Sequence, residues 1–345
     1  MSTESLAQST EYWDAFAGDA TSVNAPLYVR LAKGVRDDAE LRALAAHIQP
    51  GQLPANMLFG AVHFLLLRGS QHPLRGFYPN LTGKISGGDP FPVFRDFCLG
   101  NRAAITPMLE TRVTNTNEVA RSAILYPGFV ALAREAPQPF HLIEVGPSAG
   151  LNLYWDRYGY RYTRGSEAFM GGAKDAELVI DTPLKGDRLP PLDPPPRVGK
   201  RIGIERSPVD LANADDRDWL KALVWPDHAQ RFHRLELALK VNAQWPHDIR
   251  AGDAVALMPD VLAEIPEDET LCLYHTMAIY QFTEDAKRAF EDILILASVR
   301  RPLFRLSLER ENGAFPLTLT RYADGAATAK VLAMGGPQGG WLEWR

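Results

Sequence analysis

The sequence predicts an α/β protein in which a helical N-terminal part precedes a mostly parallel sheet that ends in an antiparallel hairpin. Three observations lead to this prediction. Apolar residues in the first part of the chain, 1–113, recur at helical spacing without a strand-like alternation. Leu142, Ile143 and Val145 form an apolar run with β-branched residues, which breaks into a glycine-containing turn and then a helix. From residue 201 onward strand-like and helical runs alternate, and the last two strands flank Asp324-Gly325, a hairpin turn.

Length, composition and charge restrict the class of protein. The chain has 345 residues, 46% of them hydrophobic, which is enough for one large or two ordinary domains with a substantial core. A formal net charge of −5 gives no electrostatic footprint for nucleic acid or for an anionic membrane. Residues 1–16 lack the pattern of a secretory signal, and the longest apolar stretch, 59–67, is too short to span a bilayer. We therefore expect a cytoplasmic protein that binds neither nucleic acid nor membranes.

The two cysteines give no sign of a metal centre. Cys98 and Cys272 are far apart in sequence, and neither has a second Cys or His at the close spacing of a zinc site. We expect both to be core thiols and predict no metal.

The first 113 residues are expected to form a separate helical domain. Helical spacing is found at 37–48, 54–68 and 91–110. Between the last two, residues 68–92 are rich in Gly, Pro and Asn and read as a long loop. A loop of this length in a compact chain more often has a function than serves only as a connection.

A further helix is predicted from Thr114, which is a candidate cap, toward Glu135. Asn117 and Arg121 are four residues apart and would share a face of this helix, with Glu118 in its first turn. These residues either form a solvated helix start or line a ligand pocket, and we take Asn117, Glu118 and Arg121 as candidate substrate-binding residues.

The centre of the second domain, 114–345, is the strand, turn and helix around residue 146. Gly146 and Gly150 permit backbone angles and close approaches that a Cβ forbids. A helix that starts at Leu151 would present free N–H groups and a partial positive charge to the end of the strand. An anion, a carboxylate or a nucleotide edge is expected there.

Residues 158–197 look like an insertion, with a hairpin and a proline-rich linker in place of a crossover helix. Tyr158, Tyr160 and Tyr162 alternate and therefore place three rings on one face. We favour local packing of the insertion over a stacking platform for a base.

The strand at 201–205 ends in Glu205, and an acid at this place can accept hydrogen bonds from a ribose diol. The usual interval from the glycine turn is about 20 residues. Glu144 and Glu205 are 61 positions apart, and the insertion accounts for the excess. The elements that follow are helices at 215–241, a short run at 249–254, a helix at 258–263, a strand at 270–277, a helix at 282–298, a strand at 302–309 and the hairpin strands 317–322 and 329–333.

The spacing Glu-x-Gly-x-Ser-x-Gly at 144–150 lacks the glycines of the dinucleotide fingerprint and resembles the first motif of class I S-adenosylmethionine-dependent methyltransferases. Glu205, Gly252-Asp253-Ala254 and the strand that ends at His275 follow in the order that these enzymes use, and the terminal hairpin is similar to their last two strands. More closely, Val-Gly-Pro-Ser-Ala-Gly-Leu-Asn-Leu, Ala-Leu-Val-Trp-Pro-Asp and Gly-Gly-Trp-Leu-Glu-Trp together resemble a bacterial family described as a domain of unknown function with a methyltransferase-like core.

The resemblance implies a Rossmann-like methyltransferase fold and S-adenosylmethionine as the cofactor. The glycine turn would approach the methionine part of the cofactor, with Glu144 beneath its amino group. Glu205 would hold the ribose, and Asp253 with the backbone of Ala254 would hold the adenine. The complete set of cofactor-binding candidates is Glu144, Gly146, Ser148, Gly150, Asn152, Glu205, Asp253 and Ala254.

His275 ends the fourth strand of the expected order, from which methyltransferases address the methyl acceptor. A histidine can take up a proton as the methyl group arrives, although a lone histidine in an apolar strand is also commonly a hydrogen-bonded core residue. Tyr274 is the second catalytic candidate. The helical domain would cover the strand ends and exclude water.

Two other functions are compatible with the sequence. Gly-x-Ser-x-Gly at 146–150 is also the nucleophile elbow of α/β-hydrolases, in which Ser148, then Asp253 or Asp260, then His275 would follow the required order. The elbow should follow several earlier strands, whereas the chain before 139 reads as helices. The other function is a methyltransferase-like protein that binds a small molecule without turning it over. We expect a methyltransferase that acts on a small molecule, and its oligomeric state is left open.

Overall fold

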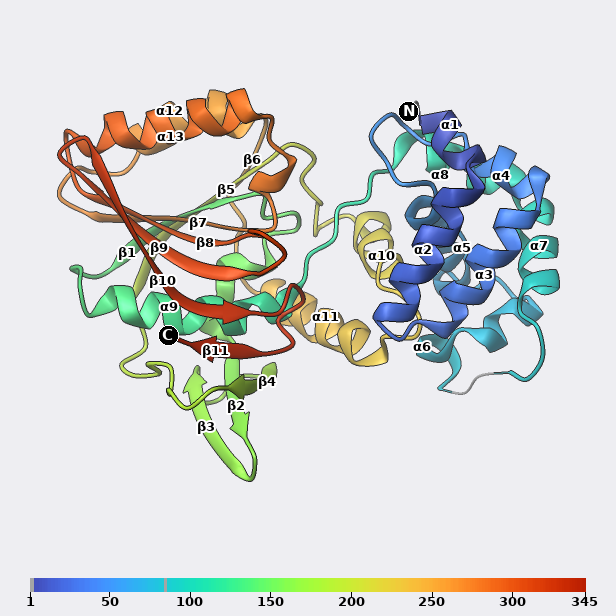
Figure 1. Ribbon diagram of the computed structural model, residues 1–345, viewed down its shortest axis with the longest axis horizontal. Coiled ribbons are helices and arrows are strands. Elements are labelled where there is room, and N and C mark those ends of the chain that lie inside the picture. Colours follow the sequence, from blue (N-terminus) through green and yellow to red (C-terminus); the bar gives the residue numbers. More distant parts are fainter. Residues whose placement is uncertain (1–2, 84–85) are drawn as a thin grey trace. The chain divides into compact units, whose positions relative to one another are not determined.

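The computed structural model describes residues 3–83 and 86–345 and divides into two compact units (Figure 1). The helical unit contains the chain up to Thr116 together with Val209–Glu236, and the sheet unit contains Asn117–Pro208 and Leu237–Arg345. The sequence predicted a domain boundary at 113, which put residues 209–236 in the second domain, whereas the structure has them in the helical unit. That segment joins the helical unit through contacts with residues far away in sequence, which local patterns cannot reveal.

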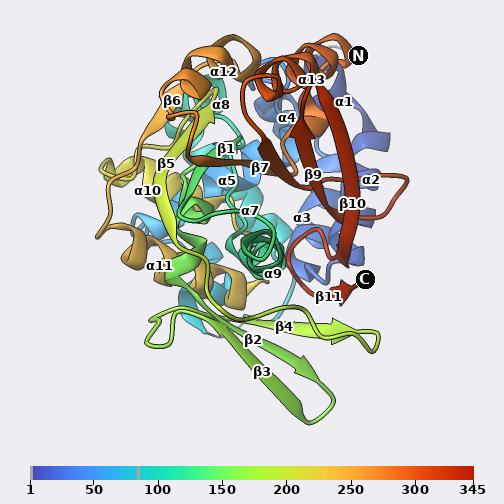
Figure 2. The ribbon, with the colours of Figure 1, turned by 90° about the vertical axis from the view of Figure 1, so that its left-hand side faces the viewer.

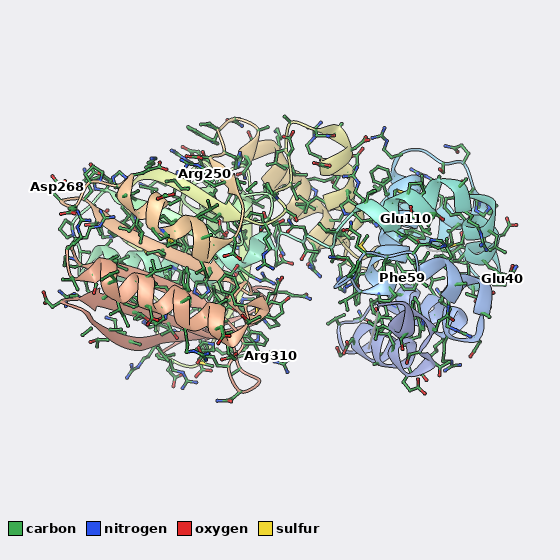
Figure 3. All side chains as sticks on the ribbon, turned by 90° about the horizontal axis from the view of Figure 1, so that it is seen from above. Glu40, Phe59, Glu110, Arg250, Asp268 and Arg310 are labelled. Atoms are coloured by element: carbon green, nitrogen blue, oxygen red, sulfur yellow. The ribbon has the colours of Figure 1, made fainter. Side chains whose placement is uncertain are left out.

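Helices make up the regular structure of the described part of the helical unit. Phe59, on the nearly all-apolar helix α5, points into the centre of the unit, whereas Glu40 lies at its periphery (Figure 3). The predicted loop at 68–92 contains two short helices in its described part, η1 and α6. The elements are α1 (Thr3–Gln8), α2 (Thr10–Ser22), α3 (Pro26–Asp37), α4 (Ala39–Ala45), α5 (Pro54–Leu67), η1 (Pro73–Phe77), α6 (Pro79–Thr82), α7 (Phe91–Gly100), α8 (Arg102–Thr111) and α10 (Ala214–Ala222), while α11 (Ala229–Asn242) has residues in both units.

His63 is a buried polar side chain on the apolar helix α5, and both of its ring nitrogens have hydrogen-bond partners. Its Nδ1 lies 2.8 Å from the carbonyl oxygen of Ala222, in the second segment of this unit, and its Nε2 lies 2.9 Å from Asn80 Nδ2. Burial lowers the pKa of His63 to about 4. The ring is therefore neutral at pH 7, and both of its nitrogens are used by the fold.

The sheet unit is built on one mixed sheet, in the order β3-β2-β4-β11-β10-β9-β8-β7-β1-β5-β6. Neighbouring strands from β6 to β8 in this order are parallel, and β8, β9, β10 and β11 pair antiparallel. The predicted α/β class, with antiparallel C-terminal strands, is confirmed. The strands are β1 (Phe140–Val145), β2 (Gly159–Arg164), β3 (Glu167–Gly172), β4 (Val179–Lys185), β5 (Val198–Glu205), β6 (Ile249–Ala251), β7 (Thr270–Thr276), β8 (Leu303–Leu308), β9 (Pro316–Ala323), β10 (Ala326–Gly335) and β11 (Leu342–Trp344).

Helices cover both faces of the sheet. Helices α12 (Ala254–Ala263) and α13 (Glu284–Ser298) lie on one face, and α9 (Ser122–Ala133) lies on the other (Figures 1 and 2). Val145 packs in the core beneath α12 and α13, whereas the ring of Tyr274 meets Phe129 of α9 edge-on, with 5.3 Å between ring centroids. Because side chains alternate along a strand, Tyr274 and His275 point to opposite faces of the sheet.

The helix predicted from Thr114 begins later than expected. A 3-10 turn, η2 (Val119–Arg121), precedes α9, and residues 114–118 are not helical. The Glu118 carboxylate accepts the N–H of Ala120 at 3.1 Å and caps this turn, so the cap lies four residues after the predicted one. The prediction that Asn117 and Arg121 share a helix face is therefore wrong.

The insertion forms β2, β3 and β4, which extend the sheet through the parallel pair β11–β4. The rings of Tyr158, Tyr160 and Tyr162 are fully buried, and each hydroxyl donates to a main-chain carbonyl oxygen. The rings pack locally, as favoured from the sequence, and offer no open face for a base.

Tyr162 also replaces a main-chain hydrogen bond that is missing in α9. Pro127 lies inside this helix and has no N–H, so it cannot donate to the carbonyl of Ala123 four residues earlier. The Tyr162 hydroxyl donates to this same carbonyl oxygen at 2.8 Å. The insertion thus supplies the hydrogen bond that the proline removes.

Tyr162→Phe is expected to destabilise the protein by about 1–3 kcal/mol, since it leaves a buried carbonyl without a donor. In a Pro127→Ala background, the alanine N–H can donate to the Ala123 carbonyl oxygen. Tyr162→Phe should then lower the free energy of unfolding by at least about 1 kcal/mol less than it does in the wild type. Urea unfolding of the four proteins in this double-mutant cycle measures the difference. Equal costs in both backgrounds would contradict the compensation.

Candidate functional site

The strand order places a topological switch point between β1 and β7. From β1 the chain builds outward through β5 and β6 on one side, and then through β7 and β8 on the other. Ligands of open α/β sheets bind outside the carboxyl ends of the strands at such a point. The turn that follows Val145 and the end of β7 at Thr276 lie at this edge of the sheet.

The turn after β1 has three residues in the left-handed region. The φ angles of Gly146, Ser148 and Gly150 are 72°, 57° and 76°. A Cβ on Gly146 would come within 2.6 Å of the Ala278 Cβ, and one on Gly150 within 2.9 Å of His247 Cδ2. The glycines are thus required both by backbone conformation and by close packing, and Ser148 accepts a strained conformation.

The helix expected after this turn is a short 3-10 helix, η3 (Leu151–Arg157), with non-helical angles at Tyr154. Its first N–H, from Leu151, donates to Asn117 Oδ1 at 3.0 Å. The predicted α-helix is therefore wrong, since the segment is a short 3-10 helix, and its first N–H is already accepted by a side chain of the protein.

Glu144 is a buried acid on β1, two residues before the first glycine of the turn. It is 1% exposed, and its Oε2 accepts the hydroxyl of Tyr274 at 3.0 Å. Burial, with a contribution from the nearby Glu205, raises the pKa of Glu144 to about 8, although Tyr274 and Arg121 act in the opposite direction. Glu144 is therefore mostly protonated at pH 7.

Glu205 joins the turn after β1 to the end of β5. Its carboxylate accepts the N–H of Ser148 at 2.9 Å and the N–H of Ser207 at 3.2 Å. A carboxylate has about four acceptor positions, so two further donors can be accommodated.

Asp253 caps α12 through its Oδ1, which accepts the N–H groups of Val255 and Ala256, and its Oδ2 lies 3.0 Å from Arg206 Nη2. The ion pair with Arg206 is the first cause that lowers the pKa of Asp253. Ala254 occupies the first position of α12, where helix geometry provides no acceptor for its N–H.

Asn152 is used by the fold. It is 1% exposed, its Oδ1 accepts the Ser122 hydroxyl at 2.7 Å, and its Nδ2 lies 3.4 Å from the carbonyl oxygen of Glu118. Together with the bond from Leu151 to Asn117, these contacts fasten the segment at 117–122 to the glycine turn.

Arg121 places a cation at this edge, in addition to Arg206 beside Asp253. Its Nε donates to the Pro337 carbonyl oxygen at 2.8 Å, and its Nη1 lies 3.3 Å from the carbonyl oxygen of Thr276. The structure thus brings Asn117, Glu118 and Arg121 to the candidate site, but the Asn117 side chain contacts main chain.

His275 pairs with an acid that the sequence analysis missed. His275 Nδ1 lies 2.7 Å from Glu309 Oε1, and this oxygen also accepts the N–H groups of Ala278 and Ile279 at 2.9 and 3.1 Å. Glu309 directly follows β8, which is the parallel neighbour of β7. Glu309 could have been found from the sequence as the acid at the end of the strand next to the one that carries His275.

The other acid partners that were considered for His275 lie elsewhere. Asp260 is part of α12, and Asp253 is occupied by its helix cap and Arg206. The hydrolase arrangement with either aspartate as the partner of His275 is wrong, because the carboxylate bonded to this ring is Glu309.

Metal clusters, membrane-spanning helices and the cysteines can be judged over the described ranges, 3–83 and 86–345. There, no cluster of three or more His, Cys, Asp or Glu is suited to a metal ion. No described helix has the length and apolarity needed to cross a membrane. Cys98 and Cys272 are free and buried, as predicted.

Comparison with known proteins gives one match. No curated protein matches the chain, and no solved structure does. The model of one protein family covers residues 11–344, nearly the whole chain. The protein therefore belongs to DUF2332, the family of uncharacterized proteins conserved in bacteria.

Proposed function

We propose that this protein is an S-adenosylmethionine-dependent methyltransferase that acts on a small molecule. The observation that carries the proposal is the pair of acids beside the left-handed turn at the switch point. Glu144 lies on β1, two residues before Gly146 at the start of this turn, and the Glu205 carboxylate at the end of β5 accepts the N–H of Ser148 in the turn.

The residues present fit the cofactor. Its sulfonium and ammonium groups are cationic, and the carboxyl ends of β1, β5 and β6 carry Glu144, Glu205 and Asp253. Glu205 would accept the ribose hydroxyls with its remaining acceptor positions, and the N–H of Ala254 would face the adenine. Glu144 would become ionised beside the ammonium group. When bound, the cofactor supplies an electrophilic methyl group.

The order β6-β5-β1-β7-β8 supports a nucleotide-binding site, because it corresponds to 3-2-1-4-5 in doubly wound sheets. Beyond β8 the sheet departs from that pattern, since β9 follows without an intervening helix and is antiparallel.

Calorimetric titration with S-adenosylmethionine and S-adenosylhomocysteine tests the proposal. We expect 1:1 binding with a Kd of about 1–100 μM, in the ordinary range for such ligands. A protein that is folded by circular dichroism and binds neither compound would rule out the methyltransferase.

One observation favours a second candidate, a serine hydrolase. Ser148 has a φ of 57° in the turn that follows β1, and a nucleophile elbow places its serine on such a strained turn. Against this, β1 is the first strand of the sheet in chain order. A fluorophosphonate probe, followed by peptide mapping, distinguishes the two, since only a hydrolase should be labelled at Ser148.

A further inference from the structure

Two buried histidines of this protein differ in how their ring nitrogens are used. Both nitrogens of His63 have hydrogen-bond partners in the helical unit. His275 is 3% exposed, and its Nδ1 is held by Glu309, but its Nε2 is buried without any partner among the described residues. The fold therefore uses only one side of the His275 ring.

The contact with Glu309 fixes the chemical state of the ring. The N–H groups of Ala278 and Ile279 donate to Glu309 Oε1, and His275 Nδ1 lies 2.7 Å from the same oxygen. Burial raises the pKa of Glu309, but the contact with His275 and the two N–H groups outweigh this, and the pKa is lowered. An ionised carboxylate at 2.7 Å requires a proton on Nδ1. In the neutral ring the lone pair is then on Nε2.

An unused acceptor in the interior is unfavourable. A buried polar atom without a partner costs about 1–3 kcal/mol. A histidine that served only to pack would gain by using this nitrogen, as His63 does. Two neighbouring atoms of the site, His275 Nε2 and Glu309 Oε2, are buried without a partner among the described residues. Of the two, the lone pair on Nε2 is the one on a ring held in place by its other nitrogen, and it indicates an incoming hydrogen-bond donor.

The position of His275 connects it to the candidate site. In the β1–β7 register His275 is the partner of Val145, the residue before Gly146. The Ala278 backbone, which is bonded to Glu309, carries the methyl group that packs against Gly146. The pair therefore lies beside the turn where the methyl donor is expected.

We propose that His275 Nε2 is the base that accepts the proton of the methyl acceptor, with Glu309 as its positioning residue. This inference rests on the proposed function. It assigns the acceptor to the class of neutral nucleophiles that carry a proton, such as a hydroxyl or an amine.

The proposed step transfers the methyl group from the sulfonium donor to the acceptor. A lone pair of the acceptor oxygen or nitrogen forms the bond to the methyl carbon, and the carbon–sulfur bond of the methylsulfonium donor breaks with its electron pair going to sulfur. The acceptor proton moves to Nε2. The resulting imidazolium is stabilised by the Glu309 carboxylate through the Nδ1–H bond.

Access to Nε2 requires a local rearrangement, because this atom is closed to solvent. The adjoining segment, 277–281, begins at Met277, whose φ of 54° is strained for a residue other than glycine. Catalytic hydrogen bonds commonly form only in the complex, so closure in the free protein is compatible with this role.

Diethyl pyrocarbonate tests the inference without a known acceptor, since it acylates an accessible, unprotonated imidazole nitrogen. Modification of the native protein at pH 7 is followed by peptide mass spectrometry. His47, whose side chain is 46% exposed, serves as the reactive reference, and buried His63 serves as the unreactive one. We expect His275 to react at least about tenfold faster than His63, a difference of about 1.4 kcal/mol in activation free energy.

Glu309→Gln removes the charge that orients the ring, and it is expected to slow the modification of His275 about tenfold. His275 labelling as slow as that of His63 would overturn the inference, since Nε2 would then be sealed in the core. A Glu309→Gln rate equal to wild type would overturn the positioning role.

Binding of S-adenosylhomocysteine separates this inference from the proposed function. His275→Gln should change its Kd by less than about threefold, because the base faces the acceptor. If His275 reacts but the protein binds no cofactor, the methyltransferase proposal is contradicted, and only the reactivity of the His275 imidazole is retained. Cofactor binding with an unreactive His275 would retain the methyltransferase and contradict the base.

Discussion

Glu205→Ala is expected to weaken the binding of S-adenosylhomocysteine at least about 100-fold. The ribose diol would donate two hydrogen bonds to this carboxylate, and a hydrogen bond to a charged group contributes about 1.5–3 kcal/mol. Loss of about 3 kcal/mol corresponds to roughly two powers of ten in Kd. Isothermal titration calorimetry of wild type and variant measures the effect.

Two controls separate a ligand contact from a structural role. Glu205 also accepts the N–H groups of Ser148 and Ser207, so Glu205→Gln, which keeps one acceptor oxygen, is compared for both Kd and thermal stability. Glu264→Ala is the matched carboxylate, since Glu264 pairs with Lys200 and Arg250 and lies at the end of α12 opposite to Asp253. Unchanged binding in a folded Glu205→Ala protein would show that Glu205 only fastens the turn.

Glu144→Gln is expected to stabilise the protein increasingly as the pH rises. The pKa of Glu144 is raised from 4.5 to about 8 in the folded protein, so its contribution to stability is fully present below about pH 4.5 and is lost as the pH rises toward 8. A glutamine keeps the acceptor for the Tyr274 hydroxyl and does not titrate. At 1.36 kcal/mol for each tenfold change, the advantage of the variant should grow by about 3 kcal/mol between about pH 5.5 and 8.

The measurement is urea unfolding of both proteins across this range. The groups that act on Glu144 are Tyr274, Glu205 and Arg121, and they remain in the variant. Glu309→Gln is the control of opposite sign, because the pKa of Glu309 is lowered and its contribution to stability is lost as the pH falls. A difference between wild type and Glu144→Gln that stays constant with pH would mean that Glu144 titrates normally.

Much of the candidate site was visible in the sequence because its residues are placed by short-range rules. An acid, a strand and two glycines within seven positions predicted the turn after β1, and the end of β5 identified Glu205 in spite of the long insertion. Strand ends in a parallel sheet meet at one edge, so a correct strand order is enough to gather these residues.

Other parts of the site could not be predicted in this way. The Asn117 side chain replaces a ligand at the start of η3 because the non-helical segment before α9 runs beside the turn. Glu309 becomes the partner of His275 only through the lateral pairing of β7 with β8. Both contacts join residues more than 30 positions apart, and no periodicity in the chain encodes them.

The sequence by itself determined the α/β class, the antiparallel C-terminal hairpin and the position of the glycine turn, because hydrophobic period and turn chemistry are local properties of the chain. Only the tertiary structure decided which segment completes the helical unit, which carboxylate holds His275 and which acid is buried beside Tyr274. These depend on desolvation and on contacts between distant residues, which arise only when the chain is packed.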